Sequence, residues 1–159
     1  MRKPWMFYSV VAVALVCAPT AGAQWGACNQ RMLEGVWSAT CTGFTDLSKL
    51  VPGTPPGTMA PLSMISRGVI KRGGGGTREG FGSVPGLVSA IEMEEKFTIN
   101  PDCTGEKTYT MKIAELNLTL SGKATFILMP GGHELQMMLL NPGDTITCEY
   151  KKMANSPLF

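Results

Sequence analysis

The chain has 159 residues, of which 44% are hydrophobic and only 16% are charged, against about 25% charged in an average soluble domain. This balance excludes a disordered polyelectrolyte, which needs low hydrophobicity and high net charge. The 19 glycines and 11 prolines predict many turns, but they stay below the share of roughly 25–30% that is typical of low-complexity chains. At about 150 residues per domain, the length predicts one globular domain.

The N-terminus has the pattern of a secretory signal peptide. Residues 2–3 are Arg-Lys, residues 6–17 are mostly apolar, and residues 21–23 are Ala-Gly-Ala, which suits signal peptidase. The alternative is an N-terminal membrane anchor, but the apolar stretch is shorter than the ~20 residues that span a bilayer. We therefore expect a signal peptide over residues 1–23 and a secreted or periplasmic mature chain that begins at Gln24.

Removal of this segment leaves 12 basic and 12 acidic residues, because the net charge of +2 comes from Arg2 and Lys3. A neutral chain has no long-range field that would steer nucleic acid or an anionic membrane toward it. Lys71, Arg72 and Arg78 form a local basic group beside glycines, which we expect at a solvated hairpin tip. We therefore expect no nucleic-acid partner and no stable membrane anchor after cleavage.

Four cysteines remain in the mature chain, and in an exported protein they predict two disulfides. They are Cys28, Cys41, Cys103 and Cys148. A zinc site is the alternative, but the chain has no Cys-x-x-Cys pair and His133 is its single histidine. We therefore expect no metal and no other cofactor.

The body of the mature chain alternates apolar and polar residues between glycine and proline breaks, which is typical of short β-strands. Strands joined by tight turns favour an antiparallel up-and-down arrangement, which removes its unpaired edges by closing into a barrel. Eight segments show the pattern: 35–44, 62–71, 77–84, 88–100, 106–113, 123–129, 133–140 and 145–151.

These segments predict an all-β fold with an eight-stranded antiparallel barrel, lipocalin-like in shape, over residues 35–152. Residues 24–34 form an N-terminal segment and residues 153–159 a C-terminal tail. A two-sheet β-sandwich is the alternative. A barrel of about eight strands has an interior that side chains can fill or that can hold one small ligand.

One segment also carries a family resemblance. Residues 97–105, Phe-Thr-Ile-Asn-Pro-Asp-Cys-Thr-Gly, resemble the stretch tyrosine-x-valine-asparagine-proline-aspartate-cysteine-threonine-glycine of the allene oxide cyclase barrel-like family of small secreted proteins. Glycine spacing elsewhere between residues 35 and 152 is similar to that family in the same order. The resemblance implies an eight-stranded barrel with an apolar lumen. It implies little about activity, because most members have no assigned one.

Glu95 departs from the family pattern, which tends to have glycine two residues before the aromatic. It shares parity with Met93 and Phe97 and would face the lumen, where burial raises a carboxyl pKa and suits general acid–base chemistry. Glu95→Gln is then expected to leave the fold intact. The alternative is a bulge near Glu94 that leaves both carboxylates in water.

Three functions are open. In the first, the apolar lumen binds a small hydrophobic, lipid- or terpenoid-like molecule. In the second, which rests on the resemblance, the lumen is the template of an isomerase or cyclase with Glu95 and Tyr109 as its catalytic groups. The third is a structural or interaction protein with a filled core, and a homo-oligomer is compatible with all three. We favour binding, with the ligand contacted by Trp37, Met64, Met93, Phe97, Tyr109, Met111 and Ile127.

The disulfide pairing follows from barrel closure. In a closed meander the first and last strands pair, which brings Cys41 and Cys148 within disulfide range. Cys28 is then left to reach Cys103 and tie down the N-terminal segment. The rival pairing joins Cys28 to Cys41 and Cys103 to Cys148.

Overall fold

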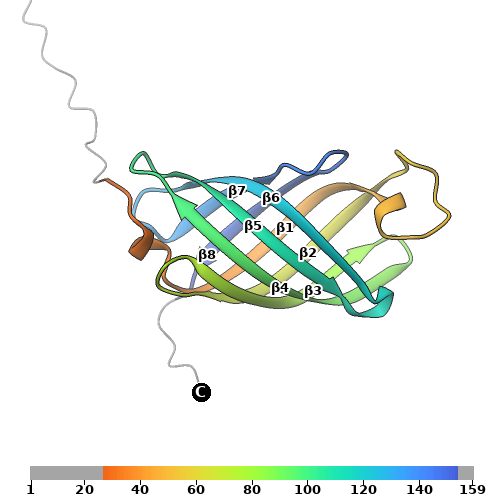
Figure 1. Cartoon of the computed structure of the whole chain (residues 1–159), viewed down its shortest axis with the longest axis horizontal. Helices are drawn as coiled ribbons and strands as arrows, with labels where there is room; N and C mark the ends of the chain where they lie inside the picture. The colour runs from red at the N-terminus through yellow and green to blue at the C-terminus, as the bar shows by residue number, and fades with distance from the viewer. Residues whose placement is uncertain (1–26, 154–159) are drawn as a thin grey trace, which may run out of the picture.

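The computed structural model describes residues 27–153 and shows a closed β-barrel (Figure 1). Each strand pairs antiparallel with the next along the chain, and the first pairs with the last. The predicted eight-stranded up-and-down barrel is confirmed, and the alternative β-sandwich is wrong. The strands are β1 (Gly35–Asp46), β2 (Met59–Ile70), β3 (Gly75–Val84), β4 (Leu87–Ile99), β5 (Thr104–Ile113), β6 (Leu118–Leu128), β7 (Glu134–Leu139) and β8 (Thr145–Lys152).

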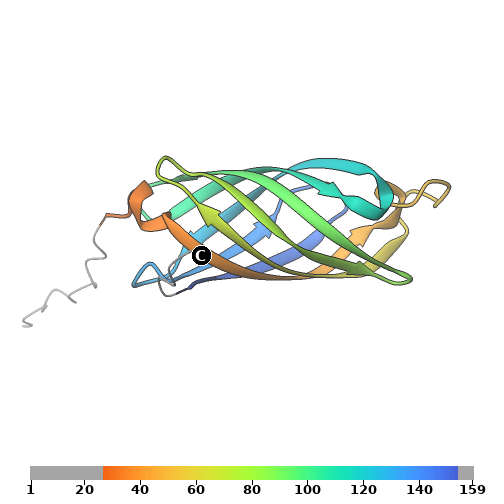
Figure 2. The same cartoon turned by 90° about the horizontal axis from the view of Figure 1, so that it is seen from below.

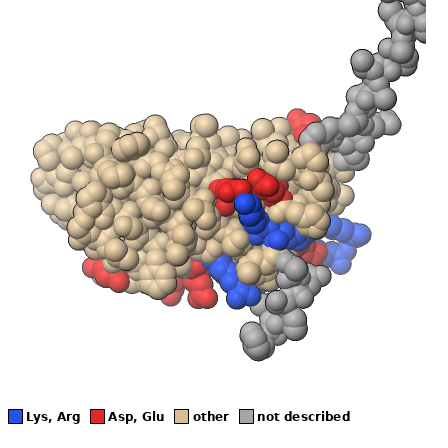
Figure 3. Space-filling view, turned by 180° about the vertical axis from the view of Figure 1, so that it is seen from behind, with Lys and Arg blue, Asp and Glu red and all other residues tan. Residues whose placement is uncertain are grey.

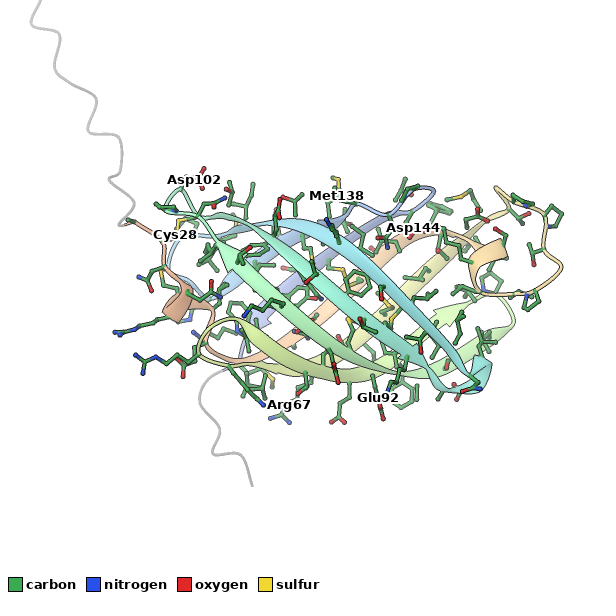
Figure 4. All side chains as sticks on the ribbon, in the orientation of Figure 1. Cys28, Arg67, Glu92, Asp102, Met138 and Asp144 are labelled. Carbon is green, nitrogen blue, oxygen red and sulfur yellow. A yellow bond between two sulfur atoms is a disulfide. The ribbon has the colours of Figure 1, made fainter. Side chains whose placement is uncertain are left out.

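Alternation along each strand separates the lumen from the outer surface. On β5, Tyr109 and Met111 are buried while Thr108 and Thr110 are exposed. This is the two-residue period that a half-buried strand requires. Figure 4 shows the outward set, with the labelled Arg67, Glu92 and Met138 pointing away from the barrel wall.

The strands are longer than the sequence pattern predicts at several ends. β2 begins at Met59, before Pro61, and β6 begins at Leu118 instead of residue 123. β3 includes glycines expected in a turn, and Gly76 pairs with Glu95 of β4. A Cβ on Gly76 would lie 2.6 Å from the Val69 carbonyl oxygen, so the close approach of β2 and β3 requires glycine at this position.

The barrel has two different ends (Figure 2). The lid end carries the β2–β3, β4–β5 and β6–β7 turns and the N-terminal 3₁₀ helix η1 (Gln30–Leu33). The mouth end carries the β1–β2 loop with η2 (Leu47–Lys49), the β3–β4 turn, η3 (Ala114–Leu116) and the β7–β8 turn.

The segment before β1 closes the lid end. Leu33 and Trp37 are fully buried, and Trp37 Nε1 donates a 2.8 Å hydrogen bond to the Leu33 carbonyl. Gln30 Nε2 donates to the Phe97 carbonyl of β4 at 3.1 Å. The expected N-terminal segment is therefore part of the barrel's core packing.

Two disulfides hold this arrangement. Cys41 and Cys148 are register partners on β1 and β8, with Cα atoms 4.0 Å apart, so their bond crosses the closure of the barrel. Cys28 is bonded to Cys103 in the β4–β5 turn, with Cα atoms 5.0 Å apart. This is the pairing expected from closure, and the rival pairing is absent. Two disulfides are compatible with an oxidising, extracytoplasmic compartment.

The predicted signal peptide and most of the expected tail lie outside the described residues. Within residues 27–153, no helix has the length and apolar character needed to cross a membrane.

Candidate functional site

A cavity of about 80 Å³ occupies the half of the lumen nearer the mouth end. Side chains from all eight strands line it, and four of these are methionines: Met64, Met93, Met111 and Met137. Leucines and other apolar residues surround the opening: Leu50, Leu62, Val84, Leu87, Leu116, Leu120 and Leu139. Unbranched thioether side chains adapt their rotamers to an irregular ligand, which suits this wall to apolar molecules of more than one shape.

The other half of the lumen is filled. Phe97 and Phe126 pack edge to face with ring centroids 5.8 Å apart, and Tyr150 packs against Phe97 at 6.3 Å. Trp37 and Leu33 lie fully buried in the same half. The filled core therefore closes the cavity toward the lid end. Toward the mouth, its lining includes leucines that are only partly buried: Leu62, Leu87, Leu116, Leu120 and Leu139.

A buried ionic network lies between the two halves. Glu95 Oε2 lies 2.6 Å from Lys107 Nζ, and Glu95 Oε1 lies 3.2 Å from Arg78 Nε. Lys107 Nζ also donates to the Tyr150 hydroxyl at 2.7 Å, and the Arg78 guanidinium carbon lies 4.4 Å from the centroid of the Tyr150 ring. Lys107 and Tyr150 both line the cavity, so the network supplies its polar floor.

The network fixes the charge state of Glu95. Burial would raise the pKa of its carboxyl, but the positive charges of Lys107 and Arg78, together with their hydrogen bonds, outweigh burial and lower that pKa below its ordinary value. Burial would likewise lower the pKa of Lys107, but contacts with Tyr150 and Glu95 hold it above the ordinary value. Both groups are ionised at neutral pH.

These contacts correct the expected role of Glu95. It does face the lumen, and its 5% exposure rules out the alternative in which a bulge leaves it in water. Its pKa is lowered, however, so the physical basis for a general acid is missing. A raised pKa was expected because only burial was considered. The two cations that lower the pKa, Arg78 and Lys107, lie on neighbouring strands.

Arg78 was expected at a solvated hairpin tip, and that expectation is wrong. Its side chain is buried inside the barrel, where Nη1 donates to the Trp37 carbonyl at 3.4 Å. It fits there because Gly68 opposite leaves room: a Cβ on Gly68 would lie 2.8 Å from the Arg78 Cβ. Arg78 and Val84 are six residues apart on one strand, so the two-residue alternation places both on the inward face. This spacing was the feature of the sequence that indicated an inward position.

Lys107 is the other functional residue that sequence reasoning missed. It alternates in step with Tyr109 and Met111, which are buried on the same strand. That parity was visible in the sequence, but lysine is almost never fully buried unless it is paired, and its partner Glu95 lies on another strand.

The structure divides the predicted ligand-contacting residues into three groups. Met64, Met93, Tyr109 and Met111 line the cavity. Trp37 and Phe97 are buried but belong to the filled half, and neither reaches the cavity wall. Ile127 is 54% exposed on the outer surface, so its assignment to the lumen is wrong; its neighbour Phe126 takes the inward position on β6.

Tyr109 lies in the wall of the cavity above Lys107. Its hydroxyl accepts a 2.7 Å hydrogen bond from Asn141 Nδ2, and Lys107 Nζ lies 5.3 Å from its ring centroid. Burial raises the pKa of the Tyr109 phenol despite the opposing effects of Asn141 and Lys107. Tyr109 is therefore a neutral hydrogen-bonding group at neutral pH.

Comparisons of the chain with family models, with curated protein sequences and with solved structures found no match. The resemblance to the allene oxide cyclase barrel-like family thus stays a prediction from the sequence.

Proposed function

We propose that this protein is an exported carrier or receptor that binds a small apolar molecule in its lumen. The molecule enters through the mouth end. The observation that carries the proposal is the cavity, which is closed by a filled core on one side and open on the other. When an apolar ligand contacts the methionines and leucines of this lining, its surface is removed from water. This burial contributes a binding free energy of about 25 cal/mol per Å² of apolar surface.

The surroundings of the mouth support entry of an apolar molecule. Residues 50–66 and 80–91, which include the β1–β2 loop after Lys49 and the β3–β4 turn, contain no charged side chain. Val51, Met59 and Val88 are exposed there, at 39%, 44% and 66%. In the view from behind, the lysines and arginines gather over the half of the barrel near the lid end (Figure 3).

An isomerase or cyclase function is not proposed alongside binding. Glu95 is engaged by two cations and has a lowered pKa, so the group expected to carry acid–base chemistry is held as a carboxylate. A wholly filled structural core is disfavoured by the open cavity.

A variant that fills the cavity tests the proposal. Gly82 lines the cavity, and a Cβ there would lie 3.5 Å from Met64 Cγ and 3.6 Å from Ile91 Cγ2, at ordinary contact distance. Gly82→Leu should therefore fold and place its isobutyl group in the space for the ligand. Thr77→Leu adds the same side chain at an exposed position of the same strand and is the matched control.

The probe is n-octanol, a neutral molecule with one narrow alkyl chain, titrated into the mature protein and followed by backbone amide NMR. We expect saturable binding to the wild type and to Thr77→Leu, and at least tenfold weaker binding to Gly82→Leu. Equal binding of n-octanol to all three proteins, or failure of the wild type to bind both n-octanol and octanoate, would refute a lumen site. Native mass spectrometry of material purified from its source should show a retained small mass.

A further inference from the structure

The charges inside the barrel do not balance. Among the described residues, Arg78, Glu95 and Lys107 are the charged residues buried as a whole, two cations and one anion, and the side chain of Asp144 nearer the mouth is 7% exposed. Asp144 near the mouth does not supply the missing negative charge, because Lys49 Nζ is already 2.9 Å from its Oδ1. An uncompensated charge in a low-dielectric interior is costly, and buried charges are normally paired.

Two residues that line the cavity carry unused hydrogen-bond donors. Within the described chain, the hydroxyls of Tyr109 and Tyr150 each accept a hydrogen bond, from Asn141 and Lys107, and neither donates one. A phenol can donate its own hydrogen as well as accept, and both tyrosines line the cavity. Arg78 Nη2 is also buried without a partner among the described residues.

We infer that the ligand of the lumen site is an organic anion with a single narrow alkyl chain, whose carboxylate lies at Lys107 between the two phenols. The inference rests on the proposed function and specifies its ligand. The carboxylate balances the excess positive charge and accepts hydrogen bonds from the hydroxyls of the two tyrosines. The alkyl chain lies along the methionines toward the mouth.

The form of the cavity sets the shape of this anion. A space of about 80 Å³ is smaller than the roughly 150 Å³ apolar cavity that accepts benzene. A ring-sized group therefore does not fit without rearrangement, whereas an alkyl chain extends through the opening past the leucine rim. Charge-assisted hydrogen bonds at the floor then favour a carboxylate over an alcohol of the same length.

Three probes of equal chain length test the head group on the mature wild-type protein at neutral pH: octanoate, n-octanol and octylammonium. We expect octanoate to bind at least tenfold more tightly than n-octanol, and octylammonium to bind more weakly than both. Equal or tighter binding of n-octanol overturns the inference but leaves the proposed function in place. Absence of binding by both octanoate and n-octanol overturns the proposed function as well.

Lys107→Met then tests the assigned cation, with Lys112→Met, exposed on the same strand, as the matched control. The preference for octanoate should disappear in Lys107→Met and persist in Lys112→Met; its persistence in both would remove Lys107 from the site. If circular dichroism shows that Lys107→Met is unfolded, Tyr109→Phe replaces it. Tyr109→Phe should weaken octanoate binding more than n-octanol binding, and an equal effect on both would contradict the inference.

One spectroscopic result would also overturn the inference. A tyrosinate signal in the ultraviolet spectrum of the unliganded protein at neutral pH would mean that the barrel balances its own charge. We expect no such signal.

Discussion

Glu95 on β4 and Lys107 on β5 form an ion pair inside the barrel, with Oε2 and Nζ 2.6 Å apart and side chains 0% and 3% exposed. Arg78 on β3 completes the contact from the other side. Three neighbouring strands thus meet at one carboxylate. The pair links stability and ligand recognition, because the same lysine supports the core and forms part of the cavity floor.

Loss of the carboxylate should destabilise the fold. Glu95→Gln leaves Arg78 and Lys107 buried without an anion, and breaking a buried ion pair costs about 3–5 kcal/mol. The sequence-based expectation of an intact fold in this variant is therefore revised. Urea unfolding of the mature protein measures the loss. Glu94→Gln, exposed on the same strand, is the control and should stay within about 0.5 kcal/mol of the wild type; equal effects of the two would contradict the assigned network.

Acid should weaken the protein through the same residue. The folded-state pKa of Glu95 is lowered, so its contribution is present above the ordinary glutamate pKa of about 4.3. Below that pH the unfolded state takes up the proton first, and the contribution is lost as the pH falls toward the folded-state pKa. A carboxyl carbon NMR titration measures this pKa directly. A midpoint for Glu95 above the ordinary glutamate pKa of about 4.3 would show that burial, rather than the cations, dominates.

The disulfide between Cys41 and Cys148 reinforces the pairing of β1 with β8 that closes the barrel. Non-reducing peptide mapping should recover this pair and the pair of Cys28 with Cys103. Replacing both Cys41 and Cys148 with alanine should lower the free energy of unfolding by about 4–5 kcal/mol in the chain-entropy model for a loop of this length. Recovery of a peptide joining Cys28 to Cys41 would contradict both the pairing and the lid.

Export should remove the first 23 residues. Residues 21–23, Ala-Gly-Ala, meet the requirement of signal peptidase for small side chains, so the secreted protein should begin at Gln24. Intact-mass measurement of exported protein tests this, allowing for loss of ammonia if the terminal glutamine cyclises. A mass that retains the N-terminal segment would refute the assignment.

The local pattern of apolar and polar residues predicted much of the fold. Two-residue alternation located all eight strands, and closure of a meander led to the pairing of Cys41 with Cys148. The strand ends were harder to predict, because Pro61 and the glycines at 75 and 76 look like turn residues but pair within the sheet.

The site was accessible only in part. Parity placed Glu95, Met93 and Tyr109 inside, but it could not show which residues of other strands face them, since that depends on the stagger between strands. Arg78 and Lys107 were missed for this reason. Ile127 was misassigned because an apolar residue on β6 was taken as inward, whereas alternation gives that face to Phe126 and Leu128.

Methyl NMR of labelled methionines tests the lumen site most directly, because methionines lie both inside and outside the barrel. Met64, Met93, Met111 and Met137 line the cavity, whereas Met59 and Met138 are 44% and 54% exposed on the outer surface. Titration with n-octanol should shift the signals of the four lumen methionines and leave those of Met59 and Met138 in place. Shifts confined to the exposed methionines, or none at saturating probe, would contradict binding in the lumen.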